Sequence, residues 1–279
     1  MPGPLHGNVR IVRNGSTSSD FVVTYPFRGN ALGALIYPLR TGPTDGAIGA
    51  QVDDPLRNKL LALLPLRDLE SVRERSSVVG YTQGDVVQKE GQEITAVHFP
   101  LSGMFSLLVV LKDGRTAETS VVGREGMIGA RAGLGAPRRS LVRVVAQLPV
   151  QALKISVKEF RNLVTHSAPM AELCVRSADV LLDQTRMTAA CNALHGVEQR
   201  FCRWLLHTAD RAESDHFVLK QELLSEMLGV HRTYITDVAN RLQKRGAIAY
   251  SRGKLQILDR SLVRDLSCEC YGLLKRNSS

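Results

Sequence analysis

The sequence has no hydrophobic run long enough to cross a membrane. Its longest clear apolar stretch is FSLLVVL at 105–111, whereas a membrane-spanning helix needs about 18 to 20 apolar residues. The N-terminus also lacks a basic region followed by an apolar core and a small-residue cleavage site, so a secretory signal is not expected. These absences argue against an integral membrane role, and we expect a cytoplasmic protein with no membrane partner.

Cysteine is scarce, and no cysteine precedes Cys174. The cysteines are Cys174, Cys191, Cys202, Cys268 and Cys270. An odd number at these positions does not form a disulfide framework, so they are interpreted as reduced thiols. The pair Cys268 and Cys270 is half of a metal site without a second pair at suitable spacing. We therefore predict no bound metal.

The composition is that of a globular protein with a basic surface. Hydrophobic residues make up 44% and charged residues 23% of the 279 residues, a balance typical of soluble domains. This length accommodates about two domains, each with its own core. The net charge of +9 favours a polyanion or an acidic surface as partner.

The N-terminal part of the chain shows no sustained period. Residues 1–53 contain Gly, Pro, Ser, Thr and Asn at short intervals, and we predict a disordered or loosely ordered extension. Residues 54–166 then predict a β domain. Two short helices are expected around Pro65, followed by short apolar stretches between turn signals such as QGD, EGQ, KDG and GREG. Such spacing is typical of a small antiparallel sandwich or barrel.

A recognisable catalytic arrangement is missing from this β domain. A β-roll also resembles the metal-binding cupins, but those need several histidines and a carboxylate inside one barrel. The predicted β domain contains only His98. Nothing in the chain pairs a nucleophile with a base at a recognisable spacing. We therefore predict no catalytic residues and no enzymatic activity.

A long helix is predicted over 167–195, where eight residues, six of them apolar, follow spacings of three and four in strict alternation. The repeat positions are Met170, Leu173, Ser177, Val180, Gln184, Met187, Cys191 and Leu194. A repeat of 3.5 residues favours a partner helix, whereas an amphipathic helix packed on its own β domain is the alternative. We predict a parallel homodimer with these residues as its seam, in which Ser177 and Gln184 fix the register.

Residues 196–279 predict a winged helix-turn-helix domain. In KQELLSEMLGV the apolar residues of a first helix end at Gly229, which supplies the backbone freedom of a tight helix-to-helix turn. The second helix buries Ile235, Val238 and Leu242 and stops at Gly246. AIAYSRGKLQIL then predicts two short strands around a turn, which form the wing.

The surface of this second helix and wing is almost purely basic. Residues 229–256 contain six Lys or Arg against one acid, Asp237, whereas a solvated helical face would mix both signs. A surface that lies against phosphates should be basic, and an α-helix fits the major groove of B-DNA. Docking on a protein is the alternative. The predicted DNA-binding residues are His231, Arg232, Thr233, Tyr234, Thr236, Asp237, Asn240, Arg241, Lys244, Arg252 and Lys254.

The order of β-roll, long helix and winged helix-turn-helix resembles the Crp/Fnr family of bacterial transcription regulators over about residues 55–270. LLSEMLGVHRTYITDVANRLQKRGAI is the most specific match. The resemblance implies an α+β fold with an antiparallel, jelly-roll-like sensor domain, and a homodimer that binds an inverted repeat in double-stranded DNA, with RNA polymerase as a further partner. Arg232 should read a guanine or hold a phosphate. Thr233 and Asp237 depart from the family pattern, so the target should differ from that of the cyclic-AMP receptor protein.

The effector of such a regulator is not identified by the sequence. The family's nucleotide receptors use a Gly-Glu pair for the ribose and an Arg-Ser or Arg-Thr pair for the cyclic phosphate. MIGARAGLGAPRRSLV aligns with that segment and makes Gly129, Arg139 and Ser140 candidate effector-binding residues. Because Ala130 replaces the ribose acid, a cyclic nucleotide is disfavoured, and a solvated surface loop is the alternative.

No cofactor is predicted. The oxygen-sensing members of the family ligate an iron–sulfur cluster with cysteines near the N-terminus, and no cysteine here precedes Cys174. An iron–sulfur cluster is therefore not expected. A cyclic-nucleotide-dependent regulator and a regulatory scaffold that does not bind DNA remain as alternatives, and the basic surface at 229–256 argues against the scaffold.

Overall fold

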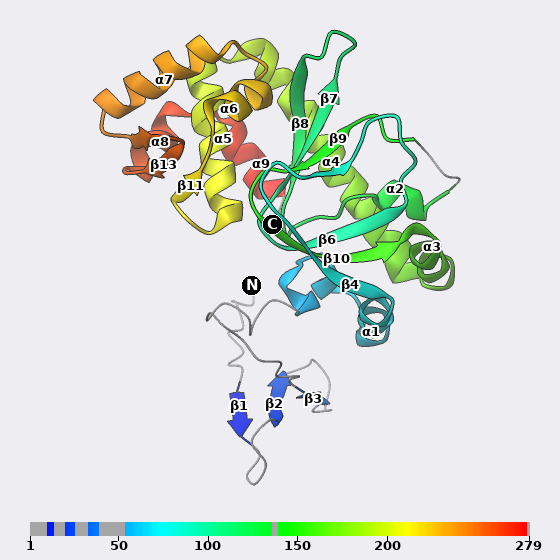
Figure 1. The fold of residues 1–279 in the computed structure, drawn as a ribbon. Helices are drawn as coiled ribbons and strands as arrows, with labels where there is room; N and C mark the ends of the chain where they lie inside the picture. Colours follow the sequence, from blue (N-terminus) through cyan, green and yellow to red (C-terminus); the bar gives the residue numbers. More distant parts are fainter. Residues whose placement is uncertain (1–9, 14–19, 26–32, 39–53, 136–138, 278–279) are drawn as a thin grey trace, which may run out of the picture. The chain divides into compact units, whose positions relative to one another are not determined.

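The computed structural model describes residues 10–13, 20–25, 33–38, 54–135 and 139–277 (Figure 1). The chain divides into two compact units, Met1–Ala50 and Gln51–Ser279. The second unit combines antiparallel sheets with helices and is of the α+β class, as the sequence predicted. Among the described residues, no helix is both long enough and apolar enough to span a membrane.

The first unit contains an antiparallel meander in the order β1-β2-β3. The strands are β1 (Arg10–Arg13), β2 (Asp20–Tyr25) and β3 (Gly33–Pro38). The sequence predicted a disordered or loosely ordered extension here, and these strands were not anticipated. Their cause is local, because β2 reads DFVVTY, a run of aromatic and β-branched residues that favour strands. The other residues of 1–53 lie outside the described residues.

The predicted β domain is a roll of two antiparallel sheets, in the orders β4-β10-β6 and β5-β9-β7-β8. The strands are β4 (Ser76–Tyr81), β5 (Val86–Gln88), β6 (Ala96–Ser102), β7 (Phe105–Val110), β8 (Thr116–Val122), β9 (Arg143–Ala146) and β10 (Val150–Ser156). Phe99 of β6 lies opposite Leu153 of β10, and both side chains are buried in the core of the roll.

Short helices cover the ends of this roll. They are η1 (Pro55–Arg57), η2 (Leu61–Leu63), α1 (Leu66–Glu74), α2 (Ala130–Gly133) and α3 (Val157–His166). η2 and α1 flank Pro65, where two short helices were expected, and Pro65 is the N-cap of α1. Leu61, Val72 and Phe160 fix these helices because all three side chains are fully buried in one hydrophobic cluster with Phe99.

The long helix α4 (Ala168–Leu194) does not present the predicted seam to a partner. Five of the seam residues are buried within their own chain: Met170, Leu173, Ser177, Gln184 and Cys191. Gln184 accepts a hydrogen bond from the backbone N–H of Val121 on β8, across 3.1 Å. Of the seam residues, Val180 and Met187 are half-buried and Leu194 is exposed. The predicted seam is therefore wrong for the buried residues, because they pack within their own chain: Met170 and Leu173 on the roll and its helices, Cys191 on Cys268 and Cys270.

A different face of α4 is apolar and uncovered. Val175 is 50% exposed and Leu182 is 46% exposed, and they lie seven residues apart. Ala168 and Ala189 extend the same heptad position in both directions and are exposed as well. We refer to Ala168, Val175, Leu182 and Ala189 as the outer stripe of α4.

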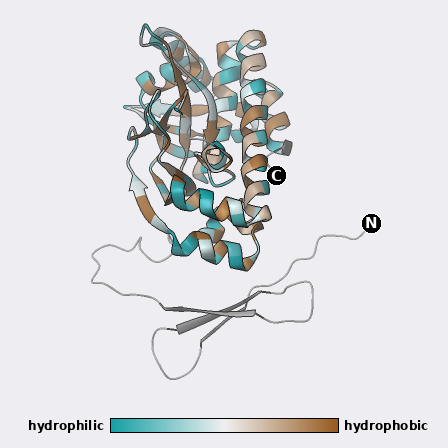
Figure 2. Ribbon diagram, turned by 90° about the vertical axis from the view of Figure 1, so that its right-hand side faces the viewer, coloured by the Kyte–Doolittle hydropathy of each residue, from teal (hydrophilic) through white to brown (hydrophobic). Residues whose placement is uncertain are grey.

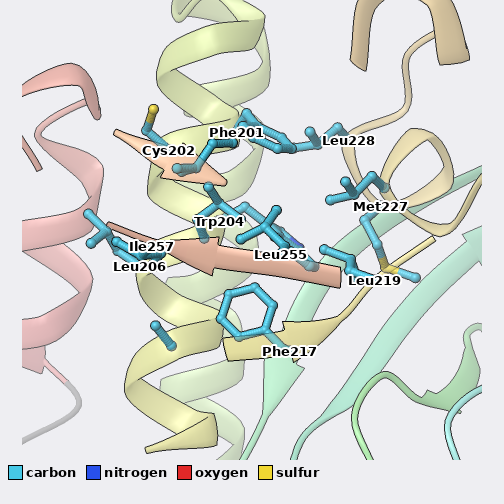
Figure 3. Close-up of a cluster of buried hydrophobic side chains, with 14 of the residues drawn as sticks. Phe201, Cys202, Trp204, Leu206, Phe217, Leu219, Met227, Leu228, Leu255 and Ile257 are labelled. Carbon is cyan, nitrogen blue, oxygen red and sulfur yellow. The ribbon is translucent and has the colours of Figure 1, made fainter. Parts of the chain in front are cut away.

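The C-terminal domain packs around one large core. Its elements are α5 (Val197–Ala212), β11 (His216–Val218), α6 (Gln221–Leu228), α7 (Arg232–Lys244), β12 (Ile248–Ser251), β13 (Lys254–Ile257), α8 (Arg260–Leu266) and α9 (Cys270–Asn277). Trp204 of α5, Phe217 of β11 and Leu255 of β13 point toward one another in this core (Figure 3). Brown and teal patches alternate along the helices in Figure 2, as amphipathic helices packed on a core require.

Candidate nucleic-acid interface

The turn between α6 and α7 is built on the glycine that the sequence singled out. Gly229 has φ 61°, a left-handed conformation that glycine adopts at little cost. The backbone N–H of Val230 donates to the carbonyl of Ser225 across 3.1 Å, which closes the end of α6. Because the turn is this short, α7 begins at Arg232 at a fixed angle to α6.

The inner face of α7 anchors it to the domain. Ile235, Val238 and Leu242 are buried, as predicted, and they belong to the same hydrophobic cluster as Leu224 and Met227 of α6. At the other end, the N–H of Gly246 donates to Gln243 and the N–H of Ala247 donates to Leu242, the Schellman pattern of a helix C-terminus. Burial of one face leaves the other face to solvent.

The predicted DNA-binding residues all lie on the outer side of α7 or on the wing. Exposed side chains are those of His231, Arg232, Thr233, Tyr234, Asp237, Asn240, Arg241, Lys244, Arg252 and Lys254, whereas Thr236 is half-buried. Tyr234 is 60% exposed although it is large and aromatic. One helix face therefore presents guanidinium, hydroxyl and amide groups, the donors and acceptors that read base edges.

Arg232 is held by acidic and amide groups of α6. Its Nη1 lies 2.6 Å from Glu222 Oε1, and its Nε donates to Gln221 Oε1 across 3.3 Å. Thr236 Oγ1 also lies 3.3 Å from Gln221 Oε1. Glu222 precedes the basic window 229–256 in sequence, so counting charges within that window missed it. The contacts orient Arg232 before any nucleic acid arrives.

A second acid neutralises the far end of α7. Glu198 in the first turn of α5 accepts from Arg241 Nε across 2.8 Å and from Arg245 Nη1 across 3.1 Å. Glu198 is more than 40 residues away in sequence, which is why no local pattern indicated this contact. Within the described part of the chain, no ion pair joins an acid to Lys244, Arg252 or Lys254. These three cations can contact phosphates without breaking an ion pair.

The wing lies beside the first turns of α7. Ser251 pairs with Lys254 across a two-residue turn, and Arg252 and Gly253 both have positive φ, 50° and 75°, as a type I′ hairpin requires. This geometry puts Arg252 at the tip. The third strand of the sheet, β11, was not predicted.

Tyr250 fastens the wing to the rest of the domain. Its backbone N–H donates to the side-chain oxygen of Gln243 on α7 across 3.0 Å. Its hydroxyl donates to the carbonyl of Leu219 across 2.7 Å. Burial raises the pKa of Tyr250 to about 12, so the hydroxyl stays a donor at neutral pH. The wing and α7 therefore form one surface.

Buried polar contacts join this domain to the roll. Trp204 of α5 donates to Glu118 of β8, and Arg211 of α5 forms an ion pair with Glu125 across 2.7 Å. At the surface, Arg124 also pairs with Glu213, whose side chain is exposed. None of these pairs follows from the sequence, since each joins segments about 90 residues apart. These side-chain contacts connect the roll directly to α5.

The candidate effector residues do not present a complete phosphate site. Ser140 is buried, and its hydroxyl donates to the carbonyl of Val142 across 2.7 Å. Arg139 Nη1 donates to the carbonyl of Gly91 across 3.0 Å and lines a surface pocket with Glu93. Gly129 lies at the N-terminus of α2 against the backbone of Ala96. The hydroxyl of Ser140 is thus already used within the loop.

Two domain families match this chain. Residues 78–167 match the cyclic nucleotide-binding domain, and residues 199–266 match the Crp-like helix-turn-helix domain. A comparison with curated proteins gave no significant match.

Solved structures of similar fold span most of the second unit. A putative transcriptional regulator of the Crp/Fnr family from Eubacterium rectale ATCC 33656 is 17% identical, with a TM-score of 0.62 over 76% of this chain and 98% of that chain. The c-di-GMP responsive global regulator CLP from Xanthomonas campestris is 16% identical, with a TM-score of 0.59 over 70% and 100% of the two chains. A CRP/FNR family transcriptional regulator from Thermus thermophilus is 20% identical, with a TM-score of 0.58 over 68% and 98%.

Proposed function

This chain is a transcription regulator of the Crp/Fnr type, because it joins a cyclic nucleotide-binding domain to a Crp-like helix-turn-helix domain, and we propose that it reads an inverted repeat in double-stranded DNA as a homodimer. Helix-turn-helix regulators of this family bind DNA and are generally dimeric. They are typically not enzymes, and we propose no reaction for this chain.

The outer face of α7 is the observation that carries the proposal. Its polar side chains are exposed while the opposite face is buried, so the helix can enter a groove without unfolding any contact of the core. The major groove is about 12 Å wide and admits an α-helix. Arg252 at the wing tip and Lys244 in the last turn of α7 are both exposed and can contact the backbone phosphates.

The homodimer is supported by the outer stripe of α4. Val175 and Leu182 are large apolar side chains left about half exposed at a heptad spacing, which supplies one of the two apolar positions of a coiled-coil seam. A second copy of α4 packed in parallel covers them. The resulting two-fold axis relates the two α7 helices, and half-sites about 34 Å apart on one face of DNA match such a pair. RNA polymerase is the further partner we propose for the DNA-bound dimer.

We propose that the effector, where one acts, is not a cyclic nucleotide bound in the family's usual way. Ala130 occupies the position of the glutamate that binds the ribose in the family's nucleotide receptors, and the hydroxyl of Ser140 donates a hydrogen bond to the carbonyl of Val142. Calorimetry with cyclic AMP and with cyclic GMP should therefore detect no binding at micromolar ligand. Micromolar binding of either nucleotide, lost in Arg139→Ala, contradicts this part of the proposal.

The test of DNA reading is selection of bound sequences from a random duplex pool by the purified chain. Salt of about 0.15 M weakens nonspecific phosphate binding. We expect an enriched inverted repeat, and we expect Arg232→Ala to lose enrichment at one base pair in each half-site. Lys158 is an exposed cation on α3, far in sequence from α7, and Lys158→Ala should select the same repeat as the wild type. A folded, dimeric protein that enriches no sequence, with or without cell extract, contradicts the proposal.

A further inference from the structure

Four metal-ligating side chains meet where α4 ends. They are Cys191, His195, Cys268 and Cys270, and their ligand atoms all lie within 4.8 Å of one another. Cys191 and His195 are one helical turn apart, Cys268 lies between α8 and α9, and Cys270 is the first residue of α9. The three cysteines are fully or almost fully buried. From the sequence, Cys268 and Cys270 were interpreted as ordinary thiols, because the other two ligands, Cys191 and His195, lie more than 70 residues earlier in the chain.

The spacing of these atoms fits one metal ion. Cys191 Sγ lies 3.5 Å from Cys268 Sγ, and Cys270 Sγ lies 3.7 Å from His195 Nδ1. With zinc–sulfur bonds of about 2.3 Å, the sulfurs of a tetrahedral site lie about 3.8 Å apart. The four atoms therefore need only small adjustments to surround one ion. An iron–sulfur cluster would hold its thiolates around several metal atoms, farther apart than this.

The imidazole is oriented as a metal ligand. His195 Nδ1 faces the sulfur of Cys270, while Nε2 lies 3.3 Å from Glu269 Oε2. A ligating histidine usually donates its other ring N–H to a carboxylate, which fixes the tautomer and the ring orientation. Glu269 supplies this carboxylate from between the two cysteine ligands. Nδ1 then carries the lone pair of the ring, and it faces the cysteine sulfurs.

Two buried arginines beside the cluster form no ion pair with a carboxylate in the described part of the chain, although Arg203 interacts at longer range with Glu118. Arg200 and Arg203 are buried, and within the described residues neither forms an ion pair with a carboxylate and each has an Nε atom without a hydrogen-bond partner. Both interact electrostatically with Cys191. Buried charges in proteins are normally paired. Three thiolates around one divalent ion carry a net charge of −1, which supplies a partner for these arginines.

We propose that Cys191, His195, Cys268 and Cys270 hold one zinc ion in a closed tetrahedral site. Binding releases the three thiol protons and leaves His195 neutral. Four protein ligands leave no open position, so the ion is structural. Oxygen-preferring ions such as Mg²⁺ and Ca²⁺ do not suit this set of sulfur and nitrogen ligands.

The site clamps the hinge between the long helix and the DNA-binding domain. Cys191 lies in the last turn of α4, and Gly196 is the N-cap of α5. Cys270 opens α9, which packs on both α4 and α5. An ion bound by the end of α4 and by the start of α9 fixes the direction in which α5 leaves α4. Its removal should loosen that joint and weaken DNA binding.

The first experiment measures metal in the full-length protein purified under reducing conditions without chelator. We expect about one zinc per chain. After removal of zinc, a titration with Co²⁺ should give the visible absorption of tetrahedral cobalt together with thiolate-to-cobalt charge-transfer bands, and Zn²⁺ should abolish both. Cys268→Ala should lose the zinc and the bands. Cys174→Ala, which removes an equally buried thiol from the core of the roll, should keep them.

Glu269→Gln tests the site without removing a ligand. Because this variant loses only the carboxylate behind His195, it should fold and bind zinc about 10- to 100-fold more weakly. Reduced wild-type protein that is folded by circular dichroism, yet holds no zinc and gives no tetrahedral cobalt bands, overturns the proposal. So does a Cys191–Cys268 disulfide found by mass spectrometry in protein whose reduced form binds neither ion, or cobalt bands of full strength in Cys268→Ala.

Discussion

The indole N–H of Trp204 donates a hydrogen bond to Oε1 of Glu118 across 3.0 Å. This contact joins α5 of the DNA-binding domain to β8 of the roll. Ser106 donates to the other carboxylate oxygen across 2.5 Å. Burial raises the pKa of Glu118 to about 7, although the hydrogen bond from Ser106 and the charge of Arg203 act in the opposite direction. A carboxyl that titrates near neutral pH therefore lies between the two domains.

Replacement of Glu118 by Gln should stabilise the protein at high pH. The pKa of the folded state lies above the ordinary value of 4.5, so the folded state binds the proton more tightly than the unfolded state. The contribution of Glu118 to the free energy of unfolding is then greatest at low pH, and it falls as pH rises from about 4.5 to 7 and levels off beyond. Removing this loss is worth up to about 3 kcal/mol, since each pKa unit is about 1.4 kcal/mol. Urea unfolding midpoints of wild type and Glu118→Gln should converge at pH 5 and separate at pH 8. A separation that is the same at both pH values contradicts the assignment.

The ion pair of Arg211 and Glu125 should matter more than an exposed pair of the same length. Their side chains are only 10% and 14% exposed. Removing one partner of a buried pair costs about 3 to 5 kcal/mol, so Arg211→Ala should lower the unfolding midpoint strongly. Arg115→Ala is the matched control, because Arg115 lies 2.7 Å from Asp113 at the surface, and it should produce no measurable change. Equal effects of the two substitutions contradict this reasoning.

Acid should weaken the same buried pair. Burial favours a higher pKa for Glu125, but the charge of Arg211 and the backbone hydrogen bonds prevail and lower it. The pair therefore contributes fully above the ordinary glutamate pKa, and its contribution is lost as pH falls through the lowered value. The destabilisation caused by Arg211→Ala should consequently shrink in unfolding experiments below about pH 4.

The sequence predicted what is local and missed what is distant. The turn at Gly229, the buried positions Ile235 and Val238, and the wing hairpin follow from spacing within about 30 residues. Glu198 and Glu222, the acidic partners of α7, were missed because charges were counted only within residues 229–256. The heptad repeat of α4 predicted a helix with one buried face along its length. The period alone does not distinguish a second helix from the chain's own sheet as the element that covers this face. In the middle of α4 the partner is the sheet, because Gln184 accepts a hydrogen bond from Val121 of β8, whereas Cys191 packs on Cys268 and Cys270.

Arg232 should determine one base pair in each half-site. A bidentate contact from Arg to guanine is worth about 1 to 3 kcal/mol of discrimination, so Arg232→Ala should bind the selected site and its single-base variants with similar affinity at that position. Glu222→Gln, which frees Arg232 from its 2.6 Å ion pair, should retain the preference. Lys244→Ala should weaken binding to all sequences alike. Uniform weakening by Arg232→Ala shows instead that this side chain holds a phosphate.

Glu198 should limit the nonspecific attraction of the protein for DNA. It neutralises Arg241 and Arg245, and Glu198→Gln releases both guanidinium groups toward the phosphates. Each added phosphate contact steepens the dependence of log K on log salt by about 0.9, so the slope should steepen by up to about 1.8 in fluorescence titrations on a random duplex. Glu172→Gln makes the same charge change at an exposed position of α4, and its slope should equal that of wild type. No difference between the two variants contradicts the role of Glu198.

The outer stripe of α4 should hold the dimer together. Leu182 is 46% exposed in the single chain and lies at the heptad position of Val175 and Ala189, so Leu182→Glu places a charge in the seam without disturbing a buried side chain. Light scattering at micromolar protein should report a monomer with an unchanged circular dichroism spectrum. Leu194→Glu is the control, because Leu194 is 78% exposed but lies at a different heptad position, on the repeat that begins at Met170, and it should remain a dimer.

The same pair of variants connects the dimer to DNA reading. Two α7 helices recognise an inverted repeat only when the two-fold axis between them is present. Leu182→Glu should therefore bind a single half-site with the same affinity as one subunit of the wild type. A second half-site about 34 Å away should not increase its affinity. Leu194→Glu should keep the full gain. A monomeric wild-type protein, or a dimer that Leu194→Glu dissociates and Leu182→Glu does not, places the seam on the other face of α4 or removes it altogether.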